Sequence, residues 1–360
     1  MSPAQSLNDF EPLKVSYAEG SNIVAVDSSM DGRLIVSGCQ IGNSVTLWDR
    51  TEGERSYGYP IIIDGSSFTQ LIERDPYPVT DVKFSPDGAY VLVGSYGHNY
   101  LYYGDVGSRI TMYEVASSKV VRVHDVNKTI VQEVAFSPDG SAYAASYEMS
   151  ENPEKCTINL WDTQTGEITG SIVSDNYKVT SITFTPDGKY LVVSFDNRIN
   201  PDRIVFFDAG TGEAYKTMEE SSVSDLHFSD DGTVFAAGSN HFNGVIVWDG
   251  TSYEELHRFT TFDMPPRSTS LSPDGRFLMS TDSWKLVIWD LIENKKILSS
   301  KSYDSDYVDD FRASTFSKDG NYIIIGLDAP DDSQYKRELH ASNGMVFVYN
   351  FTNIVERYYD

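Results

Sequence analysis

Positive charge is scarce in this 360-residue sequence. It contains 53 Asp and Glu residues against 28 Lys and Arg residues, which gives a formal net charge of -25 at pH 7. A surface of this sign does not displace counterions from phosphates, so the composition argues against direct nucleic-acid binding and against anionic membranes. The surplus of carboxylates instead suits a cationic partner, a metal ion or simple solubility.

Cysteine and long apolar runs are also scarce. The two cysteines, Cys39 and Cys156, fall in different repeat units of the chain, so we expect no disulfide. The first 20 residues contain no apolar run like that of a signal peptide, and no stretch approaches membrane-spanning length. We therefore expect a soluble protein of a reducing compartment, the cytoplasm, with the nucleus as an open alternative.

Catalytic signatures are missing as well. We find no glycine-rich phosphate loop, no zinc-ligand spacing and no G-x-S-x-G elbow. No long segment has the 3.6-residue apolar period of a helix. We expect an all-β protein without a cofactor or a metal ion.

What the sequence does have is an internal repeat. An Asp-Gly pair recurs at intervals of 43 to 56 residues, preceded by an alternating strand and followed by an apolar one. Two strands that flank Asp-Gly are typical of a β-hairpin, because glycine adopts a positive φ without steric cost. The seven pairs begin at Asp31, Asp87, Asp139, Asp187, Asp231, Asp274 and Asp319.

A second landmark follows each Asp-Gly pair. It is an alternating strand that ends in an aromatic residue and usually an acid, as in Val45-Thr-Leu-Trp48-Asp49. A weaker strand then leads into the next unit, so each unit reads as four strands. We expect the terminal aromatics to be buried between units: Trp48, Tyr113, Trp161, Phe207, Trp248, Trp289 and Tyr349.

Phe-Ser-Pro-Asp-Gly followed by Trp-Asp resembles the WD-repeat family, over residues 12 to 350. The resemblance implies a seven-bladed β-propeller of four-stranded antiparallel sheets around a channel, forming a single domain over residues 1–360. The Gly-His pair that usually precedes the first strand of a blade is missing. We therefore expect blade cohesion to depend more on aromatic and β-branched packing.

Two segments compete to close the ring. Residues 12–17 align with the fourth strand of the other units, and in the family such an N-terminal strand completes the last blade. Residues 354–359 also follow the third strand of the last unit, where its own fourth strand is due. We favour residues 12–17, since this pairing ties the two ends of the chain together.

Antiparallel order places the loops between second and third strands, and those between blades, on one face, which we call the top face. Long loops there carry tyrosines among carboxylates, including Tyr147, Glu148 and Asp328. Aromatic rings and carboxylates together suit Lys and Arg side chains. We therefore predict a non-catalytic interaction scaffold or adaptor that binds a basic protein or peptide. The predicted partner-binding residues are Tyr77, Tyr102, Tyr103, Tyr177, Asp304, Asp306, Tyr307, Asp331, Asp332 and Tyr335.

Two other interpretations stay open. His98, His241 and His340 fall in top-face loops and could gather a metal or an acid–base pair over the channel, as in a lactonase-like hydrolase or an isomerase. The run Asp304-Ser305-Asp306 offers calcium ligands but lacks the Gly and the terminal Glu of an EF-hand loop. Because a fold carries no catalytic information by itself, we favour the scaffold.

Overall fold

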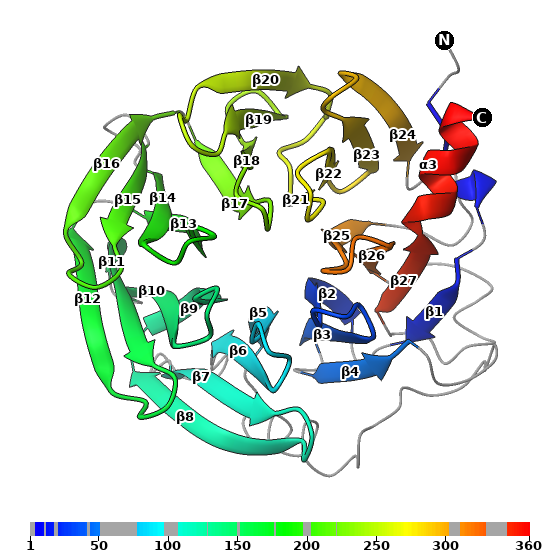
Figure 1. Ribbon diagram of the computed structural model, residues 1–360. Helices are drawn as coiled ribbons and strands as arrows, with labels where there is room; N and C mark the ends of the chain where they lie inside the picture. The colour runs from blue at the N-terminus through cyan, green and yellow to red at the C-terminus, as the bar shows by residue number, and fades with distance from the viewer. Residues whose placement is uncertain are drawn as a thin grey trace.

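The computed structural model describes most of the chain. The described residues are 4–10, 12–17, 21–41, 44–50, 78–96, 107–127, 129–149, 152–175, 178–196, 203–220, 222–301, 310–328 and 344–360. They form seven antiparallel sheets arranged in a ring around a central opening (Figure 1). The predicted seven-bladed propeller is confirmed. No helix in these ranges is long and apolar enough to cross a membrane.

The strands of each blade follow one another from the centre of the ring to its rim (Figure 1). The innermost strands are β2 (Ser21–Ser28), β5 (Val79–Phe84), β9 (Thr129–Phe136), β13 (Lys178–Phe184), β17 (Val223–Phe228), β21 (Ser268–Leu271) and β25 (Phe311–Phe316). The second strands are β3 (Leu34–Ile41), β6 (Tyr90–Tyr96), β10 (Ala142–Met149), β14 (Tyr190–Asp196), β18 (Val234–Ser239), β22 (Phe277–Thr281) and β26 (Tyr322–Leu327).

The third strands are β4 (Val45–Asp49), β7 (Gly107–Glu114), β11 (Asn152–Asp162), β15 (Arg203–Asp208), β19 (Gly244–Asp249), β23 (Lys285–Asp290) and β27 (Met345–Asn350). The outermost are β8 (Lys119–Asn127), β12 (Ile168–Asp175), β16 (Ala214–Glu219), β20 (Glu255–Thr260), β24 (Lys295–Lys301) and β1 (Lys14–Tyr17). Six sheets have four strands; in the first blade three fall within the described residues, since residues 51–77 lie outside them.

The Asp-Gly turns share one geometry in all seven blades. A Ser or Thr hydroxyl two residues before the Asp donates to its Oδ1 at 2.5–2.7 Å. The following glycine has φ between +63° and +74°, which a side chain would strain. These contacts fix the register of the two innermost strands of every blade.

Apolar clusters fill the spaces between neighbouring blades, one at each of the seven junctions. Six of the seven terminal aromatics are buried there, and Phe207 is partly buried. Trp161 stacks on Tyr143 with 5.4 Å between ring centroids. The burial of these large side chains from both sides of each junction supplies the apolar part of blade cohesion.

The N-terminal segment closes the ring. β1 pairs with β27, with Lys14 opposite Val348 and Tyr17 opposite Met345. Farther upstream Gln5 exchanges backbone hydrogen bonds with β24, donating to Ile297 O at 3.1 Å and accepting from Ser299 N at 2.7 Å. A 3₁₀ turn, η1 (Leu7–Asp9), connects the two contacts, so the N-terminal segment pairs with both of the last two blades.

The competing strand over residues 354–359 is wrong, because the chain there forms helix α3 (Phe351–Tyr359). Asn350, at the position where the other blades have an Asp or a Glu, accepts from the Asn353 N–H at 2.9 Å and caps this helix. Phe351 and Ile354 are buried, and Phe351 packs edge-on against Phe277 and Phe316. Figure 1 shows α3 beside the N-terminal segment, with both chain ends at this side of the ring.

Candidate functional site

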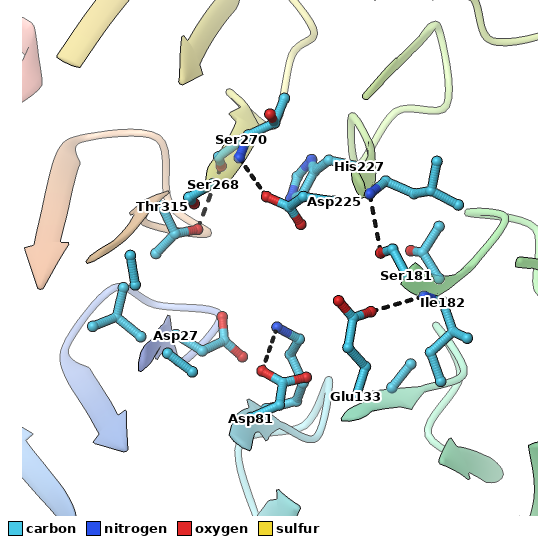
Figure 2. Close-up of a pocket in the computed structure, with 18 of the residues that line it drawn as sticks. Asp27, Asp81, Glu133, Ser181, Ile182, Asp225, His227, Ser268, Ser270 and Thr315 are labelled. Carbon is cyan, nitrogen blue, oxygen red and sulfur yellow. Dashed lines mark hydrogen bonds and ion pairs between the residues drawn. The ribbon is translucent and has the colours of Figure 1, made fainter. Parts of the chain in front are cut away.

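The innermost strands surround a cavity of about 590 Å³. Polar and charged side chains point into it from several blades, as Figure 2 shows for Asp81, Glu133, Asp225 and His227. At one end the cavity is lined by Thr180 and Ser224, near the start of innermost strands. At the other end it is lined by turn residues such as Pro86 and the exposed Met30. It is the central channel of the propeller.

Five channel residues share one position, six residues before the Asp of their own Asp-Gly turn. Each accepts a hydrogen bond from a backbone N–H of the next blade, as Glu133 Oε2 does from Ile182 N at 2.8 Å (Figure 2). Asp81 Oδ2 accepts from Val134 N at 3.1 Å in the same way. The five residues are Asp81, Glu133, Ser181, Asp225 and Ser268.

A second row lies two residues closer to the turns. Asp27 Oδ2 accepts from Phe84 N at 2.8 Å, and Ser270 Oγ accepts from Phe316 N at 3.2 Å. His227 Nδ1 accepts from Leu271 N at 3.3 Å, which leaves the proton of a neutral imidazole on Nε2.

The last junction of the ring, between blades seven and one, is bridged from Lys318 N to Ser28 Oγ at 3.0 Å. All seven junctions therefore carry a backbone-to-side-chain hydrogen bond at the channel wall. We expected blade cohesion to depend mainly on apolar packing, and these hydrogen bonds add a polar contribution.

The two rows contain four carboxyl groups, and all four act on one lysine of the channel wall, Lys83. Lys83 Nζ lies 3.1 Å from Asp81 Oδ1. Burial opposes the charge of Lys83, but the carboxylates of Asp81, Asp27, Glu133 and Asp225 outweigh burial and raise its pKa. The lysine is therefore a fixed cation that the four acids share.

One lysine does not offset the burial of all these carboxyl groups, and the pKa values of Glu133 and Asp225 are raised. Burial, together with the neighbouring charge of Asp81, raises the pKa of Glu133 to about 8. Burial also raises the pKa of Asp225 to about 6, and it lowers the pKa of His227 to about 3. Glu133 therefore holds a proton through much of the neutral range, while His227 stays neutral.

These side chains are already engaged in holding the ring together. Within the described ranges no three His, Cys, Asp or Glu residues form a group that could hold a metal ion. Cys39 and Cys156 are both free and buried, as expected from their separate blades. The channel thus combines a structural ring of hydrogen bonds with a polar cavity.

The ten predicted partner-binding residues all lie outside the described residues. They are Tyr77, Tyr102, Tyr103, Tyr177, Asp304, Asp306, Tyr307, Asp331, Asp332 and Tyr335. His98 and His340 lie outside them too, whereas His241 occupies the turn between β18 and β19. The proposed gathering of three histidines is therefore untested.

Three other residues assigned to exposed top-face loops are in fact buried. β10 and β11 extend to Met149 and Asn152, so Tyr147 lies within a strand and its hydroxyl accepts from Asn159 Nδ2 at 2.6 Å. Glu148 is buried, with Oε1 3.5 Å from Lys178 Nζ. Asp328 is buried against Arg312, whose Nε donates to it at 2.5 Å. The loop expected over residues 147–156 was too long, because strand pairing continues through most of it.

The comparisons with known proteins agree with this architecture. The family model described as "WD domain, G-beta repeat" matches residues 69–101, 164–200 and 212–251. The chain is 28% identical over 145 residues to the WD repeat-containing protein SL1-17 of Schistosoma mansoni, which covers 40% of this chain and 46% of that protein.

Two further relatives match over longer stretches. Meiotic fizzy-related protein 1 of Schizosaccharomyces pombe is 22% identical, over 58% of this chain and 47% of that protein. The serine-threonine kinase receptor-associated protein of Rattus norvegicus is 23% identical, over 60% of this chain and 56% of that protein. The chain spans about half the length of these curated relatives. The chain is therefore a seven-bladed β-propeller that carries WD repeats at the matched positions.

Proposed function

We propose that this protein is a non-catalytic interaction scaffold whose acidic, tyrosine-rich top face binds a basic protein or peptide. The observation that carries the proposal is the strand order. In every blade with four described strands, the antiparallel order gathers the connections between second and third strands and those between blades at one end of the ring. The strands that flank nine of the predicted residues meet that end, for example β26 and β27 around Asp331, and β5 begins there shortly after Tyr77.

The chemistry of these segments supports a cationic partner. Carboxylates attract Lys and Arg, and tyrosine rings add a cation–π face. The net charge of -25 favours association with a basic surface over long range.

The channel and the relatives support a scaffold more than an enzyme. The polar side chains of both channel rows accept hydrogen bonds from neighbouring blades, so they are already engaged in structure. The name of one relative describes association with a receptor. Two free, buried thiols suit a reducing compartment, and the proposal places the complex in the cytoplasm.

A pulldown with matched baits tests the proposal. The wild-type protein is compared with the double variant Asp331→Lys/Asp332→Lys. The control is Glu167→Lys/Glu213→Lys, which reverses two exposed acids in turns at the opposite end of the ring. Proteins captured from a native lysate are eluted with rising salt and identified by mass spectrometry. We expect basic partners that the top-face variant loses and the control retains; acidic partners, or equal loss from both variants, would contradict the proposal.

A further inference from the structure

An exposed tryptophan stands at the top end of the sixth blade. Trp284 lies in the turn between β22 and β23 and is 48% exposed. The other tryptophans of the chain, which has five in all, are at most 3% exposed. Met264 lies in the connection from β20 to β21 and is 42% exposed. Among the described residues these two are the large exposed apolar side chains of the top-end connections.

One buried carboxylate holds both residues in place. Asp282 Oδ1 accepts from Trp284 N at 2.7 Å, and its Oδ2 accepts from Met264 N at 3.2 Å. Asp282 itself is fully buried. The backbones of two connections from neighbouring blades are thus joined through a single side chain, so the Trp284 and Met264 side chains project from a rigid base.

The Met264 connection is fixed on its other side as well. Phe262 is buried edge-on against Trp289, and its N–H donates to Asn243 O at 3.1 Å. Asn243 Nδ2 in turn donates to Asp263 O at 3.1 Å. A preorganised surface loses little conformational entropy when a partner binds, which favours its use as an anchor.

The charge next to this pair is a carboxylate. Asp263 is exposed and directly precedes Met264. The two nearby cations are directed at protein acceptors: Lys285 Nζ donates to Thr261 O at 2.9 Å, and Arg267 Nε donates to Ser283 Oγ at 2.8 Å. An indole face beside an exposed carboxylate suits a Lys or Arg side chain, and a methionine side chain adapts to a neighbouring apolar one.

We propose that Trp284, Met264 and Asp263 form an anchor site for a partner segment that presents a Lys or Arg beside an apolar residue. This inference rests on the proposed function and assigns part of that contact to described residues of the fifth and sixth blades. The cation lies over the indole of Trp284, its charge is paired with Asp263, and the apolar residue packs on Met264. Buried aromatic anchors dominate such interfaces, so Trp284 carries the largest share of affinity.

The tryptophan distribution provides a direct readout. Because Trp284 is the exposed member of the five, acrylamide quenching of the intrinsic fluorescence reports mainly on it. The probe is a short synthetic peptide of alternating Arg and Leu, and its counterpart of alternating Glu and Leu tests charge. We expect the Arg-Leu peptide to protect the fluorescence from acrylamide and the Glu-Leu peptide to leave it unchanged.

Affinities of the dye-labelled Arg-Leu peptide then locate the site. Trp284→Ala should weaken binding about tenfold or more, and Met264→Ala and Asp263→Asn should weaken it less. The matched control is Ile292→Ala, which removes an exposed apolar residue from a turn at the opposite end of the ring. Equal effects of Trp284→Ala and Ile292→Ala, or no protection of the fluorescence, would overturn the anchor site.

The two proposals fail in different ways. If Trp284→Ala binds the Arg-Leu peptide like the wild type while Asp331→Lys/Asp332→Lys loses it, the basic-partner proposal stands and the anchor site is wrong. If the Glu-Leu peptide binds more tightly than the Arg-Leu peptide, both proposals are wrong.

Discussion

The Glu133 carboxylate accepts a hydrogen bond from the Ile182 N–H of the next blade, at 2.8 Å. This contact is one of a series that joins the blades at the channel wall, and it uses a carboxyl group whose pKa burial raises to about 8. The propeller thus depends on polar contacts at the channel wall as well as on the apolar clusters farther out.

Substitutions at Glu133 should separate the hydrogen bond from the charge. Glu133→Gln keeps an acceptor for Ile182 N and cannot become negatively charged beside Asp81 as the pH rises, so we expect unchanged or slightly increased stability. Glu133→Ala leaves the N–H without its partner and should cost about 1–3 kcal/mol of unfolding free energy. Urea denaturation measures both, and equal stability of the two variants would show that the contact is unimportant.

The same residue predicts how stability varies with pH. The folded protein binds the Glu133 proton more tightly than the unfolded chain, whose carboxyl has its ordinary value of 4.5. The contribution of Glu133 to stability should therefore fall as the pH rises from about 5 to about 8. Asp225, with its pKa raised to about 6, adds to this fall in the lower part of the range.

His227 acts in the opposite direction, but in a lower window. Since burial lowers its pKa from 6.5 to about 3, its contribution is lost as the pH falls below 6.5. Above about 6.5 the fall comes from Glu133, together with Asp27, whose pKa is also raised by burial. Melting temperatures between about 6.5 and 8 should therefore decline more steeply in the wild type than in Glu133→Gln; equal slopes in the two proteins would contradict the role of Glu133.

Removal of residues 1–18 should lower the melting temperature sharply. The deletion takes away β1, which pairs with β27, and the Gln5 contact with β24, and it exposes a sheet edge. A synthetic peptide of residues 4–18 added to the shortened protein should restore part of the lost stability, while a scrambled peptide should not. A neutral deletion in differential scanning calorimetry would show that ring closure contributes little.

A hydrogen bond from the C-terminal helix α3 to the sixth blade should make a smaller contribution to stability. The Tyr359 hydroxyl donates to Asp290 Oδ2 at 2.6 Å, and the same oxygen pairs with Arg276 Nη2 at 2.8 Å. Tyr359→Phe removes one hydrogen bond and should cost about 1 kcal/mol of unfolding free energy. The neighbouring Tyr358→Phe is the matched control and should have no measurable effect. Equal losses in the two variants would point to helix propensity instead of the hydrogen bond.

The parts of the fold that depend on local repeats could be predicted from the sequence. Asp31-Gly32 and its six counterparts mark a turn that needs a positive φ at one residue, and Trp48 and its counterparts mark strands with a buried end. Both signals recur with the same residue types, so seven blades follow from counting them.

The channel ring could not be predicted in the same way. Asp81, Glu133 and Ser181 hold equivalent positions but share only the ability to accept a hydrogen bond. Their common spacing from the Asp-Gly turn was the available signal. Helix α3 could not be predicted for another reason. Its apolar face is short, with Phe351, Ile354 and Tyr358, and the pattern that precedes it favours a strand. The candidate partner-binding residues depend on surface chemistry, which leaves no periodic trace.

Binding kinetics of the wild type and the top-face variant, with a basic partner from the pulldown, test the central claim most directly. Exposed charges mainly speed association and are screened by salt. The account predicts that Asp331→Lys/Asp332→Lys slows association and flattens its dependence on ionic strength, while Tyr102→Ala, Tyr103→Ala or Tyr335→Ala chiefly speeds dissociation. An association rate that is the same in both proteins at every salt concentration would contradict an acidic top face as the binding surface.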